Sequence, residues 1–190
     1  MRSLLYGSCI TLLLFSGCGQ REVTFEQLTV PAESLPDGCE LASGTGLPFG
    51  SSKNPNPMII TDPKEIGMLS TFALEPDLNS QIAVVPKGSA GRSQRKQIID
   101  EWSAEQAARI EAASIAGYND KSHKETVVWA LQFKDPKEAK SHFKRLSLMY
   151  QLAKHKHYFI KDSIRISLWT DNSDDLSCFN VVREHLDKIK

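Results

Sequence analysis

The chain lacks an excess of charge of either sign, because its 190 residues include 23 lysines and arginines and 23 aspartates and glutamates. Proteins that bind nucleic acid through phosphate contacts usually carry a clear positive charge or a basic stripe. The overall balance gives no indication of such a partner, and we expect none. Any binding driven by charge would have to come from a local patch of the surface.

A long apolar run is missing as well. The run at 4–15 follows Arg2 and is interrupted by Ser8, Cys9 and Thr11. As a helix this run would extend about 18 Å, whereas the hydrocarbon core of a bilayer is about 30 Å thick. The run is therefore too short for a permanent membrane span. A basic residue, a short apolar run and small residues at its end are typical of a secretory signal.

The end of this run reads Leu14-Phe15-Ser16-Gly17-Cys18. It resembles the signal of bacterial lipoproteins, which ends in a small residue, a glycine or alanine, and the cysteine that receives lipid. The last three residues match, and Phe15 stands where that family more often has leucine. The resemblance covers the first 18 residues only. It implies cleavage before Cys18, a diacylglycerol on its sulfur, and usually acylation of the new amino group.

The lipoprotein resemblance also implies a location, which is the bacterial cell envelope, with the protein anchored in a membrane and facing outside the cytoplasm. Two or more acyl chains make release from a bilayer negligible. The alternative is an ordinary secretory signal in which Cys18 is incidental. We accordingly divide the chain into a signal peptide (1–17), a short tether (18–22) and one α+β domain (23–190). A loop rich in glycine, serine and proline is expected at 43–57.

Cysteine is scarce, with four residues in the chain. Cys9 would leave with the signal and Cys18 would carry lipid, so Cys39 and Cys178 would remain in an oxidising compartment. We expect a disulfide between these two, joining the start of the folded region to its last helix. Buried free thiols are the alternative, because the distance between two cysteines is not visible in a sequence.

Motifs for catalysis or nucleotide binding are missing too. There is no Gly-x-Ser-x-Gly elbow around a nucleophilic serine. The stretch 44–53 contains glycines and a lysine, but their spacing fits neither the dinucleotide fingerprint nor the P-loop. Pro55 and Pro57 would also prevent the helix that such a site needs. We therefore predict no catalytic residue and no cofactor.

Two groups of residues contain side chains that can ligate a metal, but neither has the full ligand set of a known type of site. His155 and His157 would point to the same side of an extended segment, but zinc needs three or four ligands and the other histidines lie at unrelated spacings. The acidic loop 171–175 lacks the glycine and the distal glutamate of a calcium-binding EF-hand loop. It is also a natural entry to a helix. No metal site is predicted.

Hydrophobic periodicity predicts the secondary structure. Segment 126–133 is apolar on both faces, which indicates a central strand, and 158–160 with 164–169 indicates a β-hairpin. Helices are expected at 93–116 and 176–189 and along the apolar stripe from Ala139 to Ala153, with a further strand at 82–85. Asp62 and Asp135, each followed by proline, are typical helix N-caps. This order predicts a two-layer α+β sandwich, with a mainly antiparallel sheet covered on one face by helices.

The function expected from these features is noncatalytic. We expect a domain that binds an envelope protein or a small ligand near the membrane to which its lipid anchors it. The alternative is a hydrolase or other enzyme whose site is assembled from residues distant in sequence. A polar pocket that holds His142, His157 or His185 beside carboxylates would favour the enzyme, and a shallow apolar patch would favour binding.

Overall fold

The computed structural model describes residues 23–43, 55–72, 76–141, 150 and 152–190. In chain order the elements are two short 3₁₀ turns, η1 (Glu26–Leu28) and η2 (Ala32–Ser34), followed by β1 (Cys39–Leu41), β2 (Met58–Ile60), α1 (Pro63–Phe72), α2 (Pro76–Ala83), α3 (Arg92–Arg109), β3 (Ile110–Asp120), β4 (Glu125–Phe133), α4 (Pro136–Ser141), β5 (His155–Lys161), β6 (Ile164–Thr170) and α6 (Ser177–Asp187). None of the helices within these ranges is long and apolar enough to cross a bilayer.

Six strands form one antiparallel sheet in the order β1-β3-β4-β6-β5, with β2 also paired to β3. The prediction of a central strand at 126–133 is confirmed, since β4 lies in the middle of this order. β1 and β2 lie one after the other along the same edge of β3. Cys39 is opposite Asp120 in the first pair, and Met58 is opposite Ile115 in the second.

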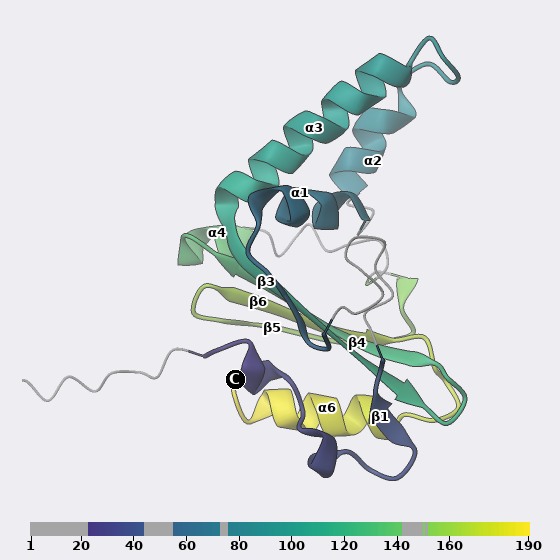
Figure 1. Ribbon diagram of the computed structural model, residues 1–190, viewed down its shortest axis with the longest axis vertical. Coiled ribbons are helices and arrows are strands. Elements are labelled where there is room, and N and C mark those ends of the chain that lie inside the picture. The colour runs from purple at the N-terminus through teal and green to yellow at the C-terminus, as the bar shows by residue number, and fades with distance from the viewer. Residues whose placement is uncertain (1–22, 44–54, 73–75, 142–149, 151) are drawn as a thin grey trace, which may run out of the picture.

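One face of the sheet packs against α6 and the segment that contains η1 (Figure 1). The predicted final helix is confirmed, with Phe179, Val182 and Leu186 buried against the sheet. Each such side chain contributes about 1.5–3 kcal/mol to stability. The other buried members of this first core cluster are Phe25, Leu28, Val30, Cys39, Ala112, Ala116, Tyr118, Val128, Ala130, Phe159, Ile164, Ile166, Leu168 and Cys178.

The opposite face carries a second core cluster under α1 and α4 (Figure 1). It includes Ala139, Tyr150 and Ala153, three positions of the expected apolar stripe. The others are Met58, Ile60, Ile66, Leu69, Ile110, Ala113, Ile115, Trp129, Leu131, Phe133 and Trp169. The α+β class and the antiparallel sheet are as predicted. Helices pack on both faces of the sheet, so the structure adds a helical layer to the one that was expected.

The long helix predicted at 93–116 is wrong at its C-terminal end, over 110–116. α3 ends at Arg109, and β3 begins at Ile110 without a loop. Alternate residues of β3 enter the two clusters, Ala112 and Ala116 on the α6 side and Ala113 on the other. A strand buried on both faces has no polar side, so its apolar positions also fit a helical stripe. The pairing of β3 with β1 and β2 on one side and with β4 on the other is what shows that this segment is a strand.

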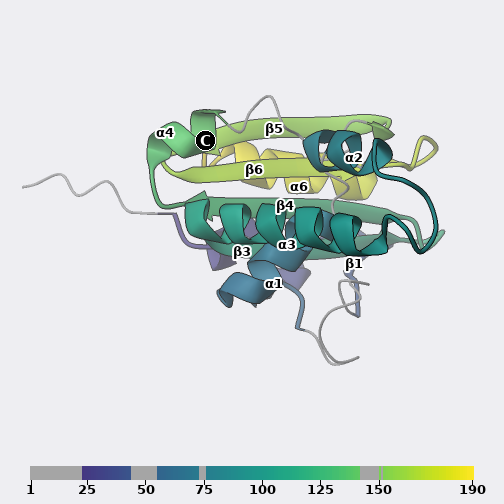
Figure 2. The same ribbon diagram turned by 90° about the horizontal axis from the view of Figure 1, so that it is seen from above.

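The strand predicted at 82–85 is also wrong, because Ile82 belongs to the last turn of α2. Leu78 is buried and Ile82 is half-buried, and their spacing of four residues puts both on one side of a helix. α2 and α3 stand away from the sheet on the side opposite α6 (Figures 1 and 2).

Local signals at turns and caps are confirmed. The carboxylate of Asp62 accepts the N–H of Lys64 at 2.7 Å, and that of Asp135 accepts the N–H of Lys137 at 2.8 Å. Each caps a helix that begins with proline. The predicted hairpin is present as β5 and β6. Of the expected loop at 43–57, the part 44–54 lies outside the described residues.

Candidate functional site

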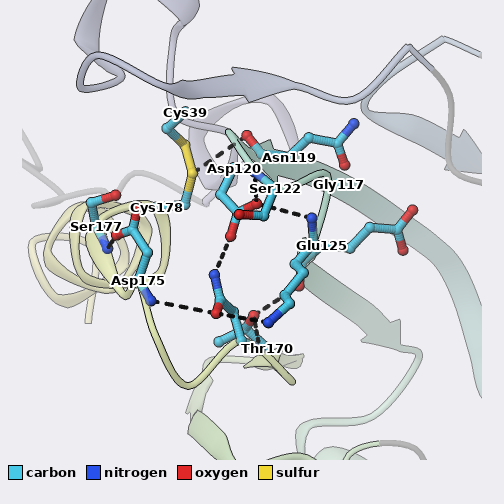
Figure 3. Close-up of a disulfide and its surroundings, with 12 residues drawn as sticks. Cys39, Gly117, Asn119, Asp120, Ser122, Glu125, Thr170, Asp175, Ser177 and Cys178 are labelled. Atoms are coloured by element: carbon cyan, nitrogen blue, oxygen red, sulfur yellow. Dashed lines mark hydrogen bonds between the residues drawn. A yellow bond between two sulfur atoms is a disulfide. The ribbon is translucent and has the colours of Figure 1, made fainter.

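The predicted disulfide is present. Cys39 at the start of β1 and Cys178 in the first turn of α6 are bonded, with their Cα atoms 5.4 Å apart (Figure 3). The bond closes a chain separation of 139 residues. Both cysteines are buried. Neither sulfur is therefore a free thiol, and the bond fixes the N-terminal segment to the helix that covers one face of the sheet. The remaining site residue, Cys18, lies outside the described residues.

Beside the disulfide lies a buried carboxylate, Asp120, at the end of β3. One of its oxygens accepts the backbone N–H groups of Ser122 at 2.7 Å and Lys124 at 2.9 Å. The other accepts a hydrogen bond from the side-chain amide of Asn172. The carboxylate thus accepts the backbone N–H groups of the turn between β3 and β4, and it connects this turn to the segment before α6. This is a structural role, because each described partner is a donor from the protein itself.

The carboxylates of the acidic loop at 171–175 also contact groups of the protein itself. Asp175 accepts the N–H of Ser177 at 2.8 Å, which lowers the pKa of Asp175 and begins α6. Asp174 accepts a hydrogen bond from Ser173 and lies 3.4 Å from the ammonium of Lys124, and both contacts lower the pKa of Asp174. Among the residues described, no group of three or more histidine, cysteine or carboxylate ligands gathers around a metal position.

The predicted common orientation of His155 and His157 is present. The ring of His155 lies 6.2 Å from that of Phe179, and Nε2 of His157 lies 3.0 Å from a carboxylate oxygen of Asp187. Both partners belong to α6, so both imidazoles point to the face of the sheet that α6 covers. The two histidines lie between β5 and α6. The neighbour of His155 is an aromatic ring and that of His157 is a carboxylate, and within the described ranges neither histidine is paired with a second imidazole there. His142 lies outside the described residues.

An open groove of about 440 Å³ lies at one end of the molecule, where the chain before η1, the turn between β5 and β6, and the C-terminal turn of α6 meet. The start of the described chain and the C-terminus lie at this same end in both views (Figures 1 and 2). The walls of the groove are mostly apolar. The lining residues are Val23, Gln27, Lys161, His185, Lys188 and Ile189.

The last turn of α6 and the two residues that follow it supply half of the groove. His185 lies in the last turn of α6, and Lys188 and Ile189 follow the helix in a turn whose N–H groups donate to the carbonyls of His185 and Leu186. The buried side chains of Val182 and Leu186 fix the rotation of the helix against the sheet. Lys188 is the residue that follows the last turn of α6, where a cation interacts favourably with the helix dipole. Lys161 ends β5, and the turn that follows it contains Asp162 in a left-handed conformation, φ 54°.

The N-terminal wall is held by hydrogen bonds that start at Thr24. Its N–H donates to the side-chain oxygen of Gln27 at 3.0 Å, and its carbonyl accepts the N–H of Gln27 at 3.1 Å. The ring Nε2 of His185 lies 2.7 Å from the carbonyl oxygen of Gln27. Since a carbonyl oxygen only accepts, this nitrogen carries the proton and donates it. The contact joins the two walls of the groove.

The groove is cationic and apolar, and none of its lining residues is a carboxylate, serine, threonine or cysteine. Its cations are Lys161 and Lys188, and Val23 and Ile189 pack against the first core cluster. The nearby acid Asp187 lies against His157 instead. Such a lining can bind an anion that has an apolar part.

The sequence did not identify this groove. In the sequence Val23 begins the expected domain, Lys161 lies between the two strands of the expected hairpin, and Ile189 ends the last expected helix. Only the tertiary fold brings them together. His185 was the one lining residue singled out as a member of a pocket. Comparison of the chain with protein-family models, with curated proteins and with solved structures finds no match.

Proposed function

We propose that this protein is a lipid-anchored component of the bacterial cell envelope, which binds a ligand close to the membrane and does not transform it. The observation that carries the proposal is the position of the groove. Val23 is both a lining residue and the fifth residue after Cys18. Five extended residues span at most about 18 Å. A lipid on Cys18 would therefore hold the groove within that distance of the bilayer surface.

The chemistry of the groove supports binding over catalysis. A hydrolase needs a nucleophile or an activated water, positioned by a base that another polar group orients. His185 is the one imidazole in the lining, and its Nε2 proton is directed at the carbonyl oxygen of Gln27. No carboxylate lies beside it in the lining. An open, mostly apolar groove with a few polar groups is typical of ligand binding.

The anchor is tested on protein extracted from the membranes of its native host. Intact-mass measurement should show a chain that begins at Cys18 and carries the added mass of a diacylglycerol and an acyl group. The matched control is Cys18→Ser, which should retain the leader and lack the added lipid mass. A native chain of unmodified mass would contradict the proposal.

A further inference from the structure

We propose that the groove binds the anionic headgroup of a membrane phospholipid, with the first carbons of its acyl chains lying on Val23 and Ile189. The inference rests on the proposed function, because the anchor is what places bilayer lipid beside the groove. It goes further by naming the ligand class, and it makes the groove a second attachment of the domain to the membrane.

The charge of the lining selects an anion. Lys161 and Lys188 are the two cationic side chains of the lining. The neighbouring acids Glu26, Asp162 and Asp187 are outside the lining. A phosphate diester with one negative charge would therefore meet two ammonium groups without a competing carboxylate in the groove. Each lysine near an anionic lipid surface contributes about 1 kcal/mol.

The apolar part of the lining selects a lipid over a free phosphate ion. Val23 and Ile189 are half-buried and continue the first core cluster to the surface. A hydrated inorganic anion gains nothing from covering these two side chains. The glycerol and first methylenes of a phospholipid would remove them from water, with a gain of about 25 cal/mol for each Å² that is buried.

The position of the groove means that a weak affinity is enough. A ligand site within a few residues of a lipid anchor faces lipid at a high effective concentration. Occupation of the groove would fix the orientation of the domain, with this end on the bilayer. The C-terminus and Val23 would lie at the membrane, and the hairpin of α2 and α3 would point away from α6 and the groove (Figure 1).

The test uses the full-length chain with Cys18→Ser, which cannot be lipidated, and NMR amide shifts during titration with monomeric dihexanoyl phosphatidylglycerol. We expect saturable shifts at Val23, Gln27, His185, Lys188 and Ile189. The double variant K161E/K188E should bind at least about tenfold more weakly. The matched control K64E/K87E makes the same charge change at exposed lysines of α1 and of the turn between α2 and α3, and it should bind as the parent does.

Three results would overturn the proposal. Equal shifts with dihexanoyl phosphatidylcholine would mean that the groove recognises no negative headgroup. Equal shifts with inorganic phosphate would mean that it binds a free anion, and absence of saturable shifts would mean that it binds neither. The titrated chain has no lipid at position 18, so the titration tests lipid binding in the groove independently of the anchor. A native protein without added lipid mass would refute the anchor and would leave the titration result unchanged.

Discussion

The side-chain amide of Asn56 pairs with the backbone of Gly117 as a neighbouring strand would. Its Nδ2 donates to the carbonyl of Gly117 at 2.7 Å, and its Oδ1 accepts the N–H of Gly117 at 3.1 Å. The same Nδ2 also donates to the carbonyl of Ala42 at 2.8 Å. Gly117 lies on β3 between the residues paired with β1 and those paired with β2. One side chain thus continues the edge of the sheet across the gap between two short strands.

Replacing Asn56 should therefore destabilise this edge. In Asn56→Asp the group that now faces the Gly117 and Ala42 carbonyls has no donor, and we expect a loss of about 1–3 kcal/mol in the free energy of unfolding. The measurement is urea denaturation followed by circular dichroism. Gly117→Ala is the control, because its Cβ would lie 3.5 Å from that of Ala42, an ordinary contact, and both hydrogen bonds would remain. Equal losses in the two variants would contradict this role of Asn56.

The disulfide should be a major source of stability. It closes a separation of 139 residues, for which the loop-entropy model gives an upper value near 5 kcal/mol. Reduction in mild conditions, or the double variant Cys39→Ser/Cys178→Ser, should lower the free energy of unfolding by several kcal/mol. Alkylation of the denatured, unreduced protein should leave both cysteines unlabelled. Ready labelling would show that the bond does not form.

Those parts of the fold that depend on local chemistry could be predicted from the sequence. The caps at Asp62 and Asp135 follow from residue type and proline position, and α6 from an apolar stripe with polar neighbours. The disulfide could be predicted by elimination, because the processing expected at the N-terminus would leave only Cys39 and Cys178 to pair. Strand β3 could not, since a segment buried on both faces has no polar alternation that would distinguish it from a helix.

The groove could not be predicted either, for a different reason. Its walls come from Val23, from Lys161 and from the end of α6, which are far apart in the chain. Their meeting depends on the first cluster, which contains Phe25 and Leu28 from the N-terminal segment and Phe179 from α6. Long-range packing of this kind leaves no periodic signal in any one segment. His185 was a candidate only because histidines are few and chemically versatile.

The buried carboxylate of Asp120 should be required as an acceptor. Asp120→Asn keeps the shape of the side chain but leaves one oxygen to accept from Ser122, Lys124 and the Asn172 amide. We expect a loss of about 1.5–3 kcal/mol, the range for hydrogen bonds to a charged group. Asp162→Asn, in the exposed turn between β5 and β6, is the control, because asparagine tolerates its left-handed φ. Thermal unfolding of the two variants should separate them clearly.

Tyr118 should make stability depend on pH in the alkaline range. Its ring is fully buried, and its hydroxyl oxygen accepts the N–H of Val30 at 2.9 Å. Burial raises the pKa of Tyr118 from 10.0 to about 12. The unfolded chain therefore loses this proton from pH 10 upward while the folded chain keeps it, so the stabilisation is complete below pH 10 and is lost as pH rises to 12.

Across this window the free energy of unfolding of the native protein should fall by about 2–3 kcal/mol relative to that of Tyr118→Phe, measured by urea denaturation at pH 9, 10, 11 and 12. Tyr158, whose burial also raises its pKa to about 12, is present in both chains and cancels in the difference. At pH 9 the variant should be the less stable of the two, because the Val30 N–H has lost its acceptor. Parallel curves for the two proteins would mean that Tyr118 ionises as readily in the folded chain as in the unfolded one.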